Sequence, residues 1–96
     1  MYPNQYIDLL KNGPDNSTVI TGYGHSYGIN GLVSSKFVLD NNVSVVIKIG
    51  DINTITLYEN DDKVIYSHEI TDDFGCKWLD KANEYFNFEP MYDAMY

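Results

Sequence analysis

The feature that most constrains this chain is an alternation of apolar and polar side chains between residues 32 and 70. Alternation with a period of two indicates β-strands that bury one face, because successive side chains point to opposite sides of a strand. Short polar segments at residues 40–42, 50–51 and 59–62 interrupt the pattern. Connections this short join neighbouring antiparallel strands, so the pattern predicts a meander with strands near 32–39, 43–49, 52–58 and 63–70.

The segments before the alternation predict a helix and a less regular strand. Tyr6, Leu9 and Leu10 share one helical face, and Gly13-Pro14 supplies a stop signal, so we expect a helix over residues 3–12. Residues 16–21 predict a further strand. Residues 22–31 contain four glycines, which favours a loop or a loosely paired hairpin.

A second helix is expected after the last strand, with Thr71 or Asp72 as its N-cap. Phe74, Trp78 and Tyr85 are spaced to form one apolar stripe, which would cover a face of the sheet.

The last residues of the chain, 88–96, are aromatic and acidic, and Pro90 interrupts them. We therefore expect the helix to end near Asn87 and the tail to dock elsewhere or to fray. A chain of 96 residues supports one core. The prediction is a single α+β domain over residues 1–96, with a helix at each end of a four- or five-stranded antiparallel sheet.

Charge is distributed unevenly along the chain. Six lysines, no arginine and fourteen acidic residues give a net charge of 6 − 14 = −8. Residues 1–48 contain three acidic and three basic residues, whereas residues 49–96 contain eleven acidic and three basic ones. A negative field repels nucleic-acid phosphates and anionic membranes, so we expect neither as a direct partner.

The acidic half predicts a surface that attracts a basic protein, with exposed tyrosines as anchors. The residues expected to form it are Glu59, Asp61, Asp62, Glu69, Asp72, Asp73, Glu84, Glu89, Asp93, Tyr23, Tyr27 and Tyr92. Carboxylates on such a surface can stand in for phosphates. The leading hypothesis is therefore a non-enzymatic inhibitor of a nuclease or another nucleic-acid-handling protein, of the phage-encoded anti-CRISPR or anti-restriction type.

Other interpretations stay open. Asp61 and Asp62 are common turn residues, Asp72 and Asp73 complement a helix dipole, and tyrosines often pack along sheet edges, so these residues could serve structure and solubility alone. The chain could also be a general interaction module, such as an immunity protein, an antitoxin or a homodimer joined by an edge strand.

Catalytic and metal signals are weak. Cys76 with His25 or His68 could form a small nucleophilic site, but no motif accompanies them, and His68 falls on the apolar face of its strand as a core histidine would. The glycines after Thr21 lack the Lys-Ser/Thr of a phosphate loop, and the two histidines and single cysteine are widely spaced. We therefore expect no enzyme activity, cofactor or metal.

The first residues of the chain lack the basic and apolar segments of a secretory signal. Cys76 is the single cysteine, so it cannot form a disulfide within the chain. Both observations favour a cytoplasmic protein.

Overall fold

The computed structural model describes the backbone of residues 3–40 and 42–94 and the side chains of residues 6–40 and 42–85. The elements are helix α1 (Pro3–Asn12), strands β1 (Ile20–Gly28), β2 (Gly31–Leu39), β3 (Val43–Lys48), β4 (Thr54–Glu59) and β5 (Lys63–Glu69), and helix α2 (Cys76–Ala94). The predicted α+β fold is confirmed.

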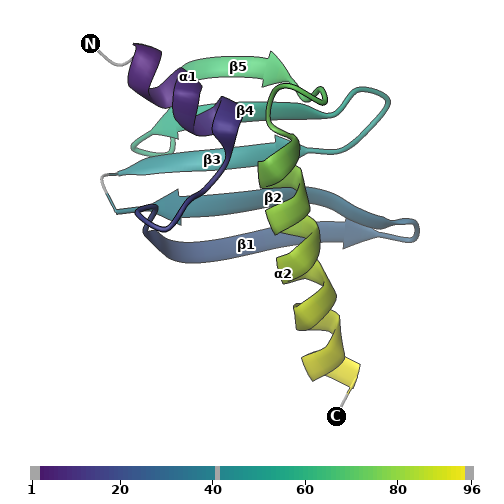
Figure 1. Ribbon diagram of the computed structural model, residues 1–96. Coiled ribbons are helices and arrows are strands. Elements are labelled where there is room, and N and C mark those ends of the chain that lie inside the picture. Colours follow the sequence, from purple (N-terminus) through teal and green to yellow (C-terminus); the bar gives the residue numbers. More distant parts are fainter. Residues whose placement is uncertain (1–2, 41, 95–96) are drawn as a thin grey trace.

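The strands form one antiparallel sheet in the order β1-β2-β3-β4-β5, which is the predicted meander with five strands. Figure 1 shows both helices on the same face of this sheet, with α1 beside β4 and α2 crossing β3, β2 and β1. In the part of the chain that the structure describes, no helix covers the opposite face. None of the described helices is long and apolar enough to cross a membrane.

The core lies between the helices and the covered face of the sheet. The alternation places its apolar residues there as predicted, and the strand side chains that become buried are Phe37, Leu39, Val43, Val45, Ile47, Ile55 and Leu57. The helices complete the core with three buried side chains, Leu10 of α1 and Trp78 and Ala82 of α2. The indole Nε1–H of Trp78 donates to the carbonyl of Leu9 at 2.9 Å, so α2 holds the end of α1 directly.

The first strand begins later than predicted and continues through the glycines. Asp15 accepts hydrogen bonds from the backbone of Ser17 and the hydroxyl of Thr18, which makes this segment a turn and delays the strand to Ile20. Of the two alternatives expected at residues 22–31, a loop or a loosely paired hairpin, the structure forms the hairpin, and its glycines pair with β2. Gly24, for example, lies opposite Lys36 of β2.

The second helix begins at Cys76, later than predicted. Thr71 and Phe74 exchange backbone hydrogen bonds of 2.9 and 3.1 Å, and Gly75 follows with a φ of +84°, so the chain makes a tight turn before the helix. The helix also passes Pro90 and continues to Ala94. A proline inside a helix removes one backbone hydrogen bond and clashes with the preceding turn, at a cost of about 3 kcal/mol, and it can kink the helix without ending it.

Candidate functional site

Four carboxylates gather where β5 leads into α2, and we call this group the acidic end: Asp51, Glu69, Asp72 and Asp73. All four side chains are exposed. The backbone N–H of Ile70 donates to the carbonyl of Asn53 at 2.8 Å, which holds the β3–β4 turn that carries Asp51 against the β5–α2 connection. Among the described side chains, no lysine forms a salt bridge with these carboxylates. The acidic end is therefore a group of exposed carboxylates without a salt-bridge partner among the described side chains.

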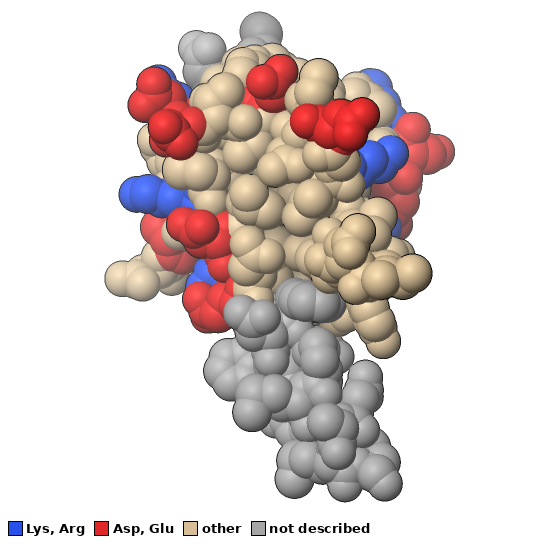
Figure 2. Space-filling model, turned by 90° about the vertical axis from the view of Figure 1, so that its right-hand side faces the viewer, with Lys and Arg blue, Asp and Glu red and all other residues tan. Residues whose placement is uncertain are grey.

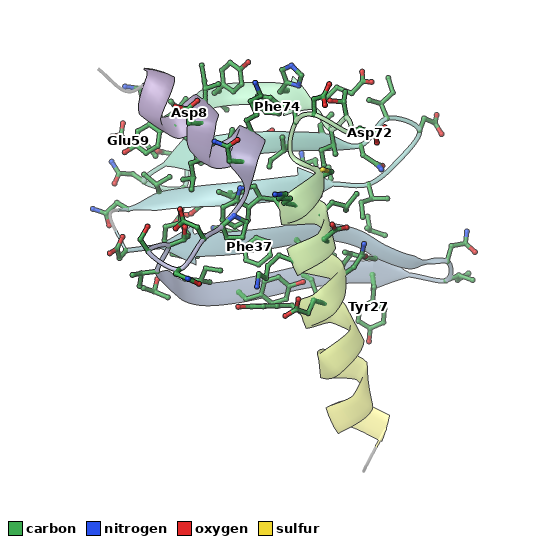
Figure 3. All side chains as sticks on the ribbon, in the orientation of Figure 1. Asp8, Tyr27, Phe37, Glu59, Asp72 and Phe74 are labelled. Carbon is green, nitrogen blue, oxygen red and sulfur yellow. The ribbon has the colours of Figure 1, made fainter. Side chains whose placement is uncertain are left out.

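A second acidic group lies in the β4–β5 turn, and we call it the turn cluster: Glu59, Asp61 and Asp62. Figure 3 shows Glu59 and Asp72 at opposite ends of the sheet. The seven residues of β5 separate the two groups, which corresponds to about 20 Å at about 3.3 Å per residue. The single acidic face expected from the sequence is therefore two separate clusters. Figure 2 faces the end of the sheet that carries the acidic end, and it shows separate red patches with blue ones beside them.

The turn cluster is partly neutralised. The Nζ of Lys36 lies 2.8 Å from Asp61 Oδ1, and the hydroxyl of Ser44 donates to the same oxygen at 3.1 Å. Hydrogen bonding to Lys36 and Ser44, with the lysine charge, lowers the pKa of Asp61 below its ordinary value of 3.8. Lys63 Nζ lies 3.9 Å from Glu59 Oε1. These carboxylates are partly occupied by contacts within the chain, so the acidic end is the better candidate surface.

The other predicted carboxylates lie on α2. Glu84 is exposed, and its Oε1 is 3.9 Å from the Nζ of Lys81 on the same helix. The side chains of Glu89 and Asp93, and that of Tyr92, lie outside the described residues.

The two predicted tyrosines of β1 have different surroundings. Tyr23 is half-buried under α2, with its ring centroid 5.0 Å from Phe37 and 4.8 Å from Tyr85, and its hydroxyl lies 2.9 Å from Ser35 Oγ. Tyr27 is 62% exposed. His25 lies between them, 5.5 and 5.7 Å from the two rings. Tyr23 is thus part of the packing beneath α2, whereas Tyr27 is at the surface.

The residues considered for catalysis are held by other contacts. The Sγ of Cys76 donates to the carbonyl of Asp72 at 3.3 Å. His68 is half-buried as predicted, with its ring stacked 4.0 Å from Phe74 and its Nδ1 hydrogen-bonded to the carbonyl of Glu69. His25 lies on β1 and His68 on β5, the two edges of the sheet. Four strand spacings put them about 19 Å apart.

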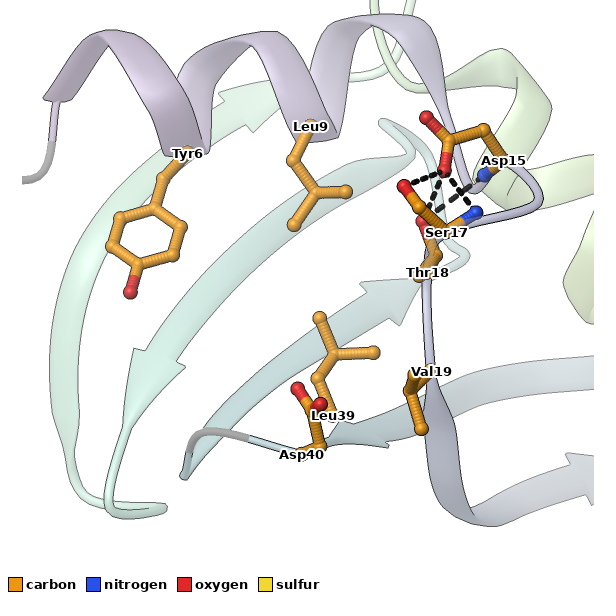
Figure 4. Close-up of a pocket in the computed structure, with 8 residues that line it drawn as sticks. All are labelled: Tyr6, Leu9, Asp15, Ser17, Thr18, Val19, Leu39 and Asp40. Carbon is orange, nitrogen blue, oxygen red and sulfur yellow. Dashed lines mark hydrogen bonds between the residues drawn. The ribbon is translucent and has the colours of Figure 1, made fainter.

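A hollow of about 330 Å³ that sequence reasoning missed lies beneath α1. Figure 4 shows the residues that line it. Leu9, Asp15 and Asp40 are among the residues that line it. The Oδ1 of Asp15 accepts from the backbone N–H of Ser17 at 2.9 Å, the hydroxyl of Ser17 at 2.7 Å and the hydroxyl of Thr18 at 3.1 Å. These bonds, with those to Ser17 the largest cause, lower the pKa of Asp15. Its carboxylate stabilises the turn by accepting a hydrogen bond from the backbone two residues later, as aspartate commonly does in turns.

No group of three or more His, Cys, Asp or Glu residues within the described ranges is arranged to hold a metal ion. Comparison with protein-family models, with curated proteins and with solved structures finds no match to this chain. The charge and geometry of the acidic end are therefore the features of this structure that bear on function.

Proposed function

We propose that this protein is a small, non-enzymatic binding domain that presents its acidic end to a basic surface of another protein. The observation that supports this proposal is the set of four exposed carboxylates with no salt bridge among the described side chains, in a chain of net charge −8. Clustered carboxylates repel one another and give little to stability, but their field accelerates and orients the approach of a positively charged partner.

A protein that binds nucleic acid fits this surface best. Such proteins carry lysine and arginine where phosphates dock, and those side chains pair equally well with carboxylates. Occupation of that surface by the acidic end would exclude the nucleic acid, so the expected consequence is inhibition. Nucleases of the CRISPR or restriction type are the partner class that we propose.

The proposal is tested by DNA cleavage assays and binding measurements with a guide-loaded Cas9-type nuclease and a restriction endonuclease. We expect wild-type protein to inhibit at least one of them, with an affinity that falls as salt rises because exposed charges are screened. The acidic-end variant D51N/E69Q/D72N/D73N should bind at least tenfold more weakly, a loss of about 1.4 kcal/mol.

A matched control separates the position of the charges from their number. The variant D8N/D40N/D62N/D80N changes four exposed carboxylates elsewhere and has the same net charge, −8 + 4 = −4. It should retain most of the inhibition. Inhibition of neither nuclease, or an equal loss in both variants, would contradict the proposal.

A further inference from the structure

The chain also has a long segment without charge. Residues 16–35 contain no Asp, Glu, Lys or Arg, although charged residues make up 21% of the sequence. The segment includes all of β1, the β1–β2 turn and the first part of β2. In Figure 2 the lower right of the described surface, at the height of this hairpin, shows no charged side chain. The hairpin is thus a neutral region of a strongly negative molecule.

The same segment exposes apolar side chains. Of the six large hydrophobic side chains that the described residues expose, four lie in it: Val19, Tyr27, Ile29 and Val33. Its strand β1 is an edge of the described sheet, with β2 as its neighbour. Edge strands are commonly protected by lysine, proline or a charge, and β1 contains none of these. An uncharged edge with exposed apolar residues favours pairing with another strand.

We infer that this edge pairs with β1 of a second copy of the chain, antiparallel and around a twofold axis at Gly24. The pairing of β1 with β2 is regular from Gly22 to Ser26, and Gly24 is the centre of that stretch. The same axis brings Val19 of one copy beside Ile29 of the other, and both are exposed in the single chain, at 51% and 104%. The dimer is joined through the uncharged part of two chains that otherwise repel each other.

The other edge of the sheet does not suit self-pairing. An antiparallel pair of β5 strands centred at Tyr66 would place Asp61 and Asp62 of one copy near Asp72 and Asp73 of the other. In that register Lys63 of each copy would face Glu69 of the other, but the carboxylates at both ends outnumber these lysines, and the remaining like charges oppose pairing. The distribution of charge therefore selects β1 as the edge that joins two copies.

The length of α2 supports the same arrangement. Its 19 residues correspond to about 28 Å, and it begins beside β4, where Gly75 is close to Ile55. The distance from β4 to β1 is three strand spacings, about 14 Å. The last turns of α2 therefore extend beyond β1, as Figure 1 shows. In the dimer these turns lie beside α2 of the second copy, which crosses its own β1 at Tyr23, next to the axis.

The inference is tested by light scattering on the purified full chain. Wild-type protein should have twice the chain mass of 11.0 kDa. Gly24→Glu and Gly24→Lys should each reduce the mass to that of one chain, because like charges then face each other across the axis. A Cβ at Gly24 meets no atom within 4 Å, so both variants should keep the fold, which circular dichroism checks. An equal mixture of the two variants should recover the doubled mass.

Matched controls place the same charges on the opposite edge. Val64 of β5 is 54% exposed, and Val64→Glu and Val64→Lys should both leave the dimer intact. A single-chain mass for the wild type, doubled masses for both Gly24 variants, or no recovery in the mixture would overturn the inference. None of these outcomes involves the acidic end, so the dimer and the proposed inhibition can fail independently.

Discussion

A buried polar contact lies among the apolar side chains on the covered face of the sheet. Ser35 is 1% exposed, and its Oγ lies 2.9 Å from the hydroxyl of Tyr23. The contact satisfies both hydroxyl groups, as buried polar atoms require. It also holds the ring of Tyr23 against the rings of Phe37 and Tyr85. Tyr23 therefore packs between β1 and α2 where the helix crosses the strand.

Asp61 is a single residue whose charge should stabilise the fold. Its pKa is lowered by the hydrogen bonds with Lys36 and Ser44. A carboxyl with a lowered pKa in the folded state stabilises that state above the pKa of the unfolded chain, and the effect is lost as pH falls through the folded value. We therefore expect Asp61→Asn to lower the melting temperature at pH 7, and the difference from wild type to shrink as pH falls below about 3.8.

Asp62→Asn is the matched control in the same turn. Asp62 is exposed and forms no hydrogen bond or salt bridge among the described side chains, so its replacement only reduces the negative charge. Its melting temperature at pH 7 should equal or exceed that of wild type. Thermal unfolding from pH 2 to pH 7 measures both variants, and equal effects of the two substitutions would contradict the role given to Lys36.

At the scale of elements, the end of α1 is fitted closely to the first turn of α2. Gly13 follows α1 with a φ of +84°, and a Cβ built on it would lie 2.5 Å from the Cβ of Lys77. The next residue of α2, Trp78, donates to the carbonyl of Leu9. The two helices therefore approach at a point that only glycine allows.

Gly13→Ala should separate these helices. A left-handed backbone conformation costs a residue with a Cβ about 1–2 kcal/mol. The new Cβ would also clash with Lys77, and the shift that removes the clash lowers the free energy of unfolding further. Trp78 is the single tryptophan and is buried, so its fluorescence in denaturant titrations reports both unfolding and any loosening of the native contact. Gly50→Ala, where a Cβ meets nothing within 4 Å, should change stability by less than about 0.5 kcal/mol. Equal stability of the two variants would contradict this account.

The sequence predicted most elements but not where β1 and α2 begin. Strands β2 to β5 follow from the alternation, because each buries one face, and α1 matches its predicted bounds of 3–12. The start of β1 depends on the turn that Asp15 makes with Ser17 and Thr18, and the start of α2 depends on the bonds between Thr71 and Phe74. Such local hydrogen bonds compete with strand and helix, and residue spacing does not reveal which of them forms.

At the scale of the molecule, the sequence predicted the amount of negative charge but not its position. Eleven acidic residues in one half of the chain suggested one face. In a meander, however, consecutive turns lie at opposite ends of the sheet, so carboxylates close in sequence are separated by the length of a strand. The same topology brings Asp51 to the acidic end, although 18 positions separate it from Glu69. The position of an acidic residue along the chain therefore did not predict where on the surface its carboxylate lies.

The acidic end should reduce stability, since no described side chain forms a salt bridge with its carboxylates. Its carboxylates repel one another, and salt screens exposed charges with a Debye length of about 10 Å at about 0.1 M. We expect the melting temperature of wild type to rise with salt. At low salt, the acidic-end variant D51N/E69Q/D72N/D73N should be more stable than wild type by up to about 1 kcal/mol, or about 4–8 °C in a domain of this size.

The control variant D8N/D40N/D62N/D80N has the same net charge as the acidic-end variant. The comparison therefore isolates the effect of placing the carboxylates close together. Its carboxylates come from α1, the end of β2, the β4–β5 turn and α2, and their removal should stabilise the fold less. Thermal unfolding of the three proteins at low and high salt makes the comparison. If the acidic-end variant melts below the control, Asp72 and Asp73 stabilise the start of α2 through its dipole, and the cluster is structural. If it melts above, the carboxylates are kept at the expense of stability, as residues selected for binding often are.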